Sequence, residues 1–279
     1  MNIQAQADKA RLFRQMHDRS KILLLPNAWD AVSARVFARS GFAAIATTSG
    51  GVAWTLGHAD GEQAPLVDIL AATARIADAV DLPVTADIEG GYGTTPEAVG
   101  DTVRAFIETG VVGVNIEDGL RAPDLLRDVD DAAVRIRAAR AAADRCGVPI
   151  VINARADTYM RQVGDDAAAR FDETVRRAKA YLAAGADCIY PIGLSDAATL
   201  GALVRALDAP VNVAARPGLP TMAELARLGV ARVSTATRLV TLALSAADTA
   251  LRRLRDTGHF DGLESALSHP DIQHLFDKT

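Results

Sequence analysis

Three acidic residues follow two short apolar segments and could together bind a metal ion. Asp87 and Glu89 lie in the segment ADIEGGYG, and Glu117 lies in VGVNIEDG. Side chains alternate along a strand, so Asp87 and Glu89 point to one side, and neighbouring strands lie about 4.8 Å apart, which lets Glu117 approach them. Carboxylates that converge in an apolar pocket repel one another, and a divalent cation would offset that repulsion. Because no histidine lies near them, the all-oxygen set predicts Mg2+, with Mn2+ as the alternative. Any one of these acids alone would be interpreted as a solvated loop charge.

An arginine follows the next apolar segment, where it could bind an anionic group. In INARAD, Asn153, Arg155 and Asp157 share one face of an expected strand. Arg155 could hold a substrate carboxylate with two parallel hydrogen bonds and offset charge that develops during a reaction. It could also form a structural ion pair with Glu117 or Asp157, and both roles are compatible. Asn212, in VNVAARPG, is a further candidate for substrate binding, with a core amide as the equal alternative.

Small residues after the second expected strand could bind a carboxylate or phosphonate through their backbone. The segment TTSGG contains Thr48, Ser49, Gly50 and Gly51. A glycine-containing turn of this kind exposes N–H groups that form an anion-binding nest. Asp60 lies further along the same long loop, in LGHADGE. Taken alone, Asp60 is interpreted as the first residue of an Asp-Gly turn.

Short apolar segments alternate with helical patterns along the whole chain and should position these residues. The expected strands are Ile22–Leu25, Ala43–Thr47, Pro83–Ala86, Val111–Ile116, Pro149–Asn153, Cys188–Pro191, Val211–Val213 and Arg232–Ser234. Such continuously apolar segments are typical of parallel strands covered on both faces. About eight strand–helix units predict an α/β protein with the (β/α)8 TIM-barrel fold, in which functional residues lie at the C-terminal ends of the strands. A doubly wound open sheet is the alternative, but it needs a glycine-rich turn where this sequence reads LLLPNAWD.

Capping residues mark the ends of several expected helices. Asp30 should cap a helix that stops at Gly41. Thr95 with Pro96 should begin another, and Ser195 should cap Ala197–Leu207.

Composition limits the classes of function. The chain has 279 residues and a formal net charge of -5 with no basic block, which argues against a nucleic-acid partner. Two cysteines are too few for a disulfide framework and predict reduced thiols. The N-terminal segment lacks the apolar core of a signal peptide, and no apolar run could span a bilayer. We therefore expect a cytoplasmic protein without a membrane partner.

We expect a single domain over residues 1–279, because no linker or composition shift divides the chain. The barrel should occupy about residues 20–240, and a helical tail about residues 241–279. The tail should begin with a long apolar-faced helix, Leu239–Leu254, followed by short polar helices that pack on the barrel or on a neighbouring subunit.

Seven segments occur in an order that resembles the isocitrate lyase/phosphoenolpyruvate mutase superfamily. They cover roughly residues 22–240 and read PNAWDAVSARVFARSGFAAIATTSGG, LGHADGE, DIEGGYG, GVNIEDG, INARAD, GADCIYPIG and NVAARPG. DIEGGYG followed by the NIEDG strand is the most specific part of the resemblance.

The resemblance implies roles for individual positions. Asp87 is implied as the direct Mg2+ ligand, and Glu89 and Glu117 as ligands acting largely through metal-bound waters. Asp60 matches an aspartate that forms hydrogen bonds near the metal, and Arg155 matches an arginine beside the reacting group. The segment Thr48, Ser49, Gly50 and Gly51 matches a backbone cradle for the carboxylate of a 2-oxo acid. Members are usually homotetramers in which a C-terminal helix swaps between subunits, so a homotetramer or homodimer is expected.

One departure from the superfamily concerns the loop after the fourth strand. Isocitrate, methylisocitrate and dimethylmalate lyases carry a KKCGH- or KRCGH-like segment there, whose cysteine donates a proton. Here the segment is GLRAPDLLRD, Gly119–Asp128, which has neither cysteine nor histidine. The lysine that mutases carry after Glu-Asp is replaced by Gly119. The loop is the expected lid and should decide the reaction.

These features predict a Mg2+-dependent enzyme that cleaves or forms a C–C or P–C bond beside a 2-oxo group through an enolate. The substrate would be a small 2-oxo acid or phosphonate. A non-catalytic barrel that binds a 2-oxo acid, or an isocitrate- or methylisocitrate-type lyase, is the alternative. A Schiff-base aldolase is disfavoured because no lysine lies near a strand's C-terminal end, and a zinc hydrolase lacks its His-x-His motif after the first strand.

Overall fold

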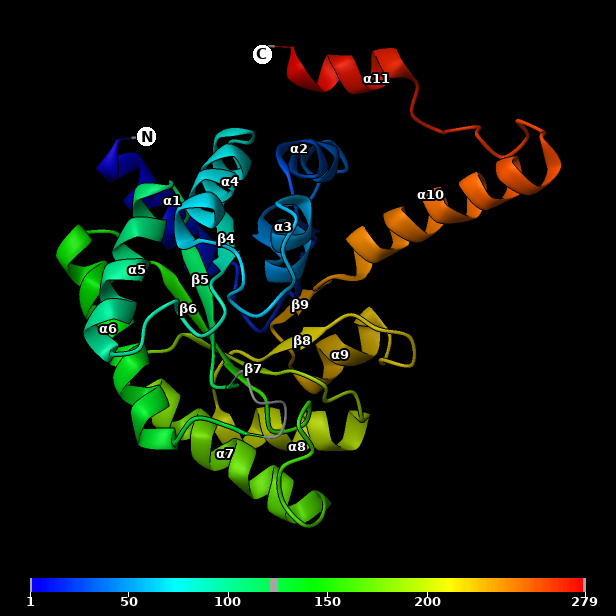
Figure 1. Cartoon of the computed structure of the whole chain (residues 1–279). Coiled ribbons are helices and arrows are strands. Elements are labelled where there is room, and N and C mark those ends of the chain that lie inside the picture. The colour runs from blue at the N-terminus through cyan, green and yellow to red at the C-terminus, as the bar shows by residue number, and fades with distance from the viewer. Residues whose placement is uncertain (1, 121–124, 278–279) are drawn as a thin grey trace.

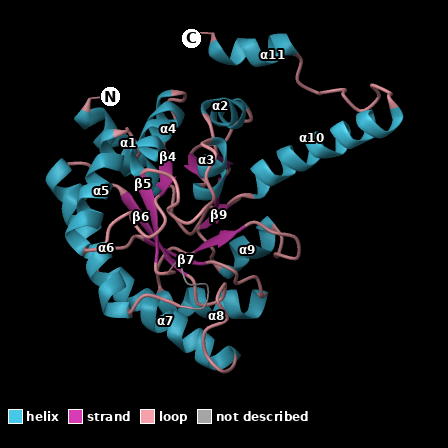
Figure 2. Cartoon of the chain, in the orientation of Figure 1, coloured by secondary structure: helices cyan, strands magenta, loops and turns pink. Residues whose placement is uncertain are grey.

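Parallel strands form a ring that is surrounded by helices in a computed structural model that describes residues 2–120 and 125–277 (Figures 1 and 2). The described strands are β1 (Leu23–Leu25), β2 (Asn27–Ala28), β3 (Ile45–Thr47), β4 (Val84–Asp87), β5 (Gly113–Glu117), β6 (Val151–Ala156), β7 (Cys188–Pro191), β8 (Asn212–Ala214) and β9 (Arg232–Ser234). The described helices are α1 (Ile3–Gln15), α2 (Ala31–Arg39), α3 (Ser49–Thr55), α4 (Leu66–Asp78), α5 (Pro96–Glu108), α6 (Val129–Cys146), α7 (Ala167–Ala183), α8 (Ala197–Leu207), α9 (Met222–Leu228), α10 (Arg238–Thr257), α11 (His269–Gln273) and the 3-10 helix η1 (His274–Phe276).

The ring closes because two parallel sheets are joined at both ends. One sheet has the order β2-β3-β4-β5-β6-β7 and the other the order β1-β9-β8. A parallel bridge between Ile189 and Val211 links β7 to the β8 side. β1 runs into β2 through Pro26, whose missing N–H interrupts the ladder. The predicted (β/α)8 TIM-barrel fold is confirmed, with the first strand divided in two.

The N-terminal end of the barrel is covered by α1. The Phe13 side chain is fully buried, and a Cβ at Gly113 would lie 2.9 Å from its ring. The Gln6 amide donates to the carbonyls of Ile107 and Val111. This end is therefore packed, and the open end of the barrel is the C-terminal one.

The predicted capping residues were correct except for one. Asp30 caps α2 in a capping box, and Thr95 caps α5. The prediction of Ser195 as the cap of α8 was wrong, because the carboxylate of the next residue, Asp196, accepts from the Thr199 N–H. A carboxylate at that position reaches the exposed N–H groups of the first turn and also complements the helix dipole.

The C-terminal helix α10 extends away from the barrel, as Figure 1 shows. Val240 is its buried residue, whereas Leu242, Leu244 and Leu251 are exposed. Beyond it the chain returns to α2, where Arg35 donates to the Leu275 carbonyl and lies over the Phe276 ring. Among the described helices, none is both long and apolar enough to cross a membrane.

Candidate active site

A cavity of about 350 Å³ opens among the C-terminal ends of the strands. Its lining includes Thr48 and Ser49 after β3, Asp87 on β4, Asn115 on β5 and Arg155 on β6, together with Asp60. The strands are parallel and in register, so their C-terminal ends bring these side chains to one place. Of the predicted residues, Thr48, Ser49, Asp60, Asp87 and Arg155 are thus brought together.

Asp87 lies at the end of β4 and is in register with Asn115 on β5. Its Oδ1 accepts from the Glu89 N–H at 3.3 Å, and its own N–H donates to Thr47 Oγ1 at 3.0 Å. Burial raises the pKa of Asp87, the positive charge of Arg155 opposes this rise, and the charge of Asp60 adds to it. A cation beside Asp87 would relieve the cost of keeping this carboxylate ionised.

Glu89 occupies a strained loop directly after β4. Its φ is +52°, in the left-handed region that non-glycine residues rarely adopt. Two donors hold its carboxylate, the Glu62 N–H at 2.6 Å and the Tyr92 hydroxyl at 2.9 Å. Burial and the charge of Asp60 raise the pKa of Glu89 to about 7.

Glu117 forms an ion pair with Arg155, with 2.6 Å between Oε2 and Nη1. Arg155 also lies 2.6 Å from Asp157 Oδ1, so the ion-pair alternative holds for both acids. Burial raises the pKa of Glu117 to about 8 although Arg155 opposes the rise. Burial lowers the pKa of Arg155, but Glu117 and Asp157 outweigh it and keep this guanidinium charged.

The three predicted metal ligands are adjacent but do not face one cavity. Asp87 lines the cavity described above, whereas Glu89 and Glu117 line a neighbouring cavity of about 790 Å³. Over residues 2–120 and 125–277, no three acidic, histidine or cysteine side chains are gathered as direct ligands of one ion. Asp87 and Glu89 nevertheless contribute to the raised pKa of Glu117, so the carboxylates share one electrostatic site. Buried, mutually repelling oxygen donors are the kind of set that fits a hard cation such as Mg2+.

The segment predicted as a glycine turn is the first turn of α3. Thr48 is the N-cap, and its hydroxyl accepts from the Gly51 N–H at 3.4 Å. The Ser49 backbone forms a hydrogen bond with the Asp87 carboxylate. A Cβ at Gly51 would lie 2.5 Å from Thr48, so that position has no room for a side chain, whereas one at Gly50 would lie 3.1 Å from Asp60, a tight contact. The turn prediction was wrong because these small residues start a helix.

Of the predicted substrate-binding residues, Gly50 and Gly51 do not line the cavity, and neither do the two asparagines, Asn153 and Asn212. Both asparagines are fully buried inside the barrel. The Asn153 amide donates to Asn115 Oδ1 at 2.9 Å, and the Asn212 amide donates to Ser234 Oγ at 3.1 Å. Their side chains form a polar layer beneath the cavity.

Asn115 and Tyr190 line the cavity but were not predicted from the sequence. The sequence contained a signal for Asn115. It lies two residues before Glu117, so the two side chains share a face of the strand, as those of Asp87 and Glu89 do. Tyr190 is in register with Arg155, so the two side chains belong to the same side of the sheet.

The predicted lid, Gly119–Asp128, lies partly outside the described residues, which omit 121–124. Its two ends are held together by a bridge between Gly119 and Leu126. Its base rests on Asp118, whose carboxylate accepts from Arg177 at 3.0 Å and from the Tyr181 hydroxyl at 2.5 Å. This buried network positions the two described ends of the loop beside the second cavity.

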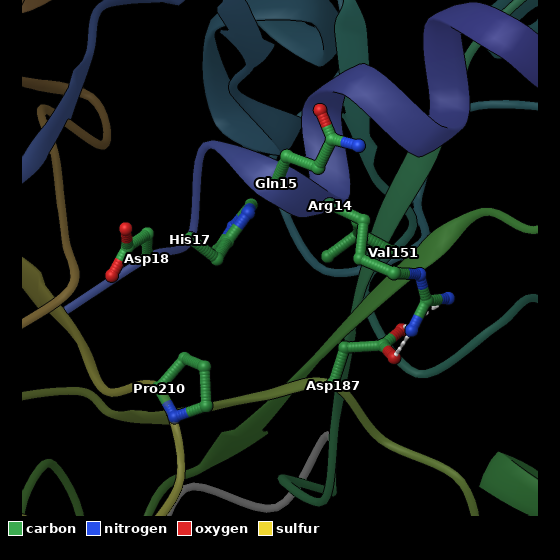
Figure 3. Close-up of a pocket in the computed structure, with 7 residues that line it drawn as sticks. All are labelled: Arg14, Gln15, His17, Asp18, Val151, Asp187 and Pro210. Atoms are coloured by element: carbon green, nitrogen blue, oxygen red, sulfur yellow. Dashed lines mark hydrogen bonds and ion pairs between the residues drawn. The ribbon is translucent and has the colours of Figure 1, made fainter.

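A further pocket lies at the opposite, N-terminal end of the barrel (Figure 3). In Figure 3, Arg14 from α1 reaches Asp187, which precedes β7. Arg140 binds the same carboxylate at 2.5 Å. In barrels of this type that end contributes to stability and not to catalysis, so this pocket is not the candidate site.

Known proteins match most of the chain. The sequence model of the family described as phosphoenolpyruvate phosphomutase matches residues 13–255. An uncharacterised protein of Mycobacterium tuberculosis is 38% identical over 88% of this chain and 89% of its own. Oxaloacetate decarboxylase of Chromohalobacter salexigens is 31% identical over 90% of this chain and 87% of its own.

Solved structures give the same assignment. A candidate phosphonomutase of Burkholderia cenocepacia has 44% identity and a TM-score of 0.84, and the match covers 88% of this chain and 99% of that one. A phosphonopyruvate hydrolase solved with oxalate and Mg2+ has 25% identity and a TM-score of 0.82, over 96% of this chain and 94% of that one. This chain therefore belongs to the isocitrate lyase/phosphoenolpyruvate mutase superfamily, whose members are lyases, mutases and hydrolases of 2-oxo acids or phosphonates.

Proposed function

We propose that this chain is a Mg2+-dependent enzyme that cleaves a C–C or P–C bond next to the 2-oxo group of a small acid and leaves an enolate. The observation that carries the proposal is the placement of Asp60, Asp87 and Arg155 in one cavity at the C-terminal end of the barrel. Two of the matched proteins are named oxaloacetate decarboxylase and phosphonopyruvate hydrolase, and both names specify a substrate of this class.

Asp87 would bind Mg2+ directly, and Glu89 and Glu117 would hold its water ligands. Bound Mg2+ would act as a Lewis acid toward the carboxylate and 2-oxo oxygens of the substrate. Asp60 would accept a hydrogen bond beside the metal. Mn2+ is the alternative ion, since its ligand preferences are similar.

The remaining residues would orient the acid. Backbone N–H groups of Thr48–Gly51 would bind the carboxylate at the start of α3, where N–H groups lack helical partners. Ser49 and Gly51 would share their N–H groups with the Asp87 carboxylate and the Thr48 hydroxyl, which they contact in this structure. Arg155 would stabilise the leaving carboxyl or phosphoryl group, because Glu117 and Asp157 keep it charged and fixed. Asn153 and Asn212 would support this layer from below and not touch the substrate.

The loop Gly119–Asp128 argues against an isocitrate- or methylisocitrate-type lyase. It contains no cysteine or histidine that could protonate a departing enolate. Decarboxylation or P–C hydrolysis would leave the enolate of pyruvate, which water can protonate, so these reactions need no cysteine on the loop and we favour them.

A substrate screen tests the proposal. Oxaloacetate, phosphonopyruvate, methylisocitrate and dimethylmalate are each incubated with the protein and Mg2+, and pyruvate release is measured with and without EDTA. We expect EDTA-sensitive release from oxaloacetate or phosphonopyruvate. Binding of these acids without turnover would instead support a non-catalytic 2-oxo-acid-binding barrel.

We also propose a single-domain cytoplasmic protein that assembles into a homotetramer or homodimer through α10. The exposed leucines of α10 support the assembly, because contiguous apolar side chains on an extended helix favour burial against another surface.

A further inference from the structure

A fully buried arginine lies inside the barrel without a carboxylate partner. Arg232 is on β9 and has no solvent exposure. Within residues 2–120 and 125–277 it forms no ion pair, and its Nε and Nη1 atoms have no hydrogen-bond partner in the protein. Other buried arginines are paired, as Arg177 is with Asp118. Burying an unpaired cation is costly, so stability alone does not explain Arg232.

Arg232 makes one described hydrogen bond, and it leads to the cavity. Its Nη2 donates to Asn115 Oδ1 at 3.3 Å, and the Asn153 amide donates to the same oxygen at 2.9 Å. A guanidinium has no acceptor atom, so the Asn115 atom that it contacts must be the oxygen. The nitrogen of the Asn115 side-chain amide therefore points away from Arg232.

Asn115 is one of the residues that line the cavity, and it is in register with Asp87. A cation on the amide oxygen polarises the amide, which makes its N–H groups stronger donors. Burial lowers the pKa of Arg232, but Cys188, Tyr190 and Asp87 counteract this, and a guanidinium stays charged in proteins. The positive charge thus lies directly behind the wall of the cavity.

We propose that Arg232 is a positioning residue that fixes the Asn115 amide with its N–H groups toward the cavity, where they donate to the substrate oxygen on which negative charge develops. The inference rests on the proposed function, since it assigns the donor for a 2-oxo acid. It adds a pair of residues, Asn115 in the cavity wall and Arg232 behind it, that would stabilise negative charge on the substrate oxygen.

A double-mutant cycle of Arg232→Met and Asn115→Ala tests the proposal. The readouts are kcat for the substrate found in the screen, the Kd of oxalate in Mg2+, and Tm. Oxalate is chosen because it is a planar anion with two adjacent oxygens, like an enolate of pyruvate. We expect each single variant to lower kcat about 100-fold and to weaken oxalate binding about 10-fold, as loss of one oxyanion donor does. The double variant should be no worse than Asn115→Ala.

The Tm readout separates positioning from a structural role. Methionine removes an unpaired buried charge, so the Tm of Arg232→Met should be equal to or above that of the wild type. Arg140→Met is the matched control, because it removes the arginine that donates to the Gly185 carbonyl and one of the two arginines that bind Asp187. This control should lower Tm and leave kcat unchanged.

Three outcomes would overturn the inference. They are additive losses in the double variant, wild-type kcat and oxalate affinity in Arg232→Met, or a fall in Tm as large as that of Arg140→Met. Failure of the proposed function has a different signature, which is a wild-type protein without turnover in the screen. In that case oxalate binding still tests the Arg232–Asn115 pair.

Discussion

Arg155 Nη1 lies 2.6 Å from Glu117 Oε2, and the two residues are in register on adjacent strands. The pair joins the proposed substrate-binding cation to a proposed metal-site carboxylate.

Replacing Arg155 with lysine should lower kcat by about 10- to 100-fold. Lysine keeps the charge but cannot present the planar fork that contacts Glu117 and Asp157 together. Steady-state kinetics measure the effect, and Arg104→Lys, on the exposed face of α5, is the control that should retain activity. Equal kcat for Arg155→Lys and the wild type would contradict a role in orienting the reacting group.

Alanine at Asp87 should abolish both Mg2+ binding and turnover, because Asp87 is the proposed direct ligand. Titration calorimetry with Mg2+ and the pyruvate assay measure the two effects. Asp101→Ala on the exposed face of α5 should change neither. An Asp87→Ala protein that remains active, with kinetics insensitive to EDTA, would show that the mechanism is wrong.

The metal-free protein should lose stability as the pH rises from 6.5 to 8. Burial raises the pKa of Glu89 to about 7 and of Glu117 to about 8, above the ordinary value of about 4.3 in an unfolded chain. Over this range the folded state holds more protons than the unfolded state, so the free energy of unfolding falls with pH. His17, whose pKa burial lowers to about 3, acts in the opposite direction, but its contribution fades as the pH rises above its ordinary pKa of about 6.5.

Calorimetric melting with EDTA and with saturating Mg2+ checks this dependence. Mg2+ competes with protons for carboxylates, so its stabilising effect should grow with pH. Glu117→Gln should flatten the metal-free curve. A metal-free Tm that rises between pH 6.5 and 8 would refute the prediction.

Alanine at Asp118 should destabilise the fold by about 3–5 kcal/mol. The change leaves the buried Arg177 without its carboxylate on this side and the Tyr181 hydroxyl without its acceptor. Denaturant unfolding measures the loss, and Asp144→Ala on the surface of α6 should change stability by less than about 0.5 kcal/mol. A loss of similar size for both variants would contradict the role of the Asp118 network.

Glutamate at Leu244 and Leu251 should dissociate the proposed oligomer. These side chains are 57% and 60% exposed and lie seven residues apart, on one face of α10. Light scattering after size-exclusion chromatography gives the mass of each protein. The same two leucines changed to methionine should preserve assembly, whereas a wild-type monomer would contradict the proposal.

The barrel and the elements that carry the site could be predicted from the amino-acid pattern. Apolar segments of strand length separated by helical patterns require parallel strands covered by helices, because both faces of each strand must be buried. The positions of Asp87, Glu117 and Arg155 at strand ends followed from that pattern. The alternation rule also applied to Asn115, but an asparagine gives a weaker signal than a carboxylate.

The polar residues that face the cavity could be identified only from the closed barrel. Asn153 and Asn212 share strand faces with site residues, yet their depth along the barrel axis places them beneath the cavity. Depth depends on how far each strand is shifted against its neighbours in the closed ring, and a single sequence does not encode that shift locally. The contact between Arg232 and Asn115 joins residues 117 positions apart for the same reason. An arginine and an asparagine so far apart in the sequence do not predict a contact. The contact forms because β9 and β5 both line the interior of the closed barrel.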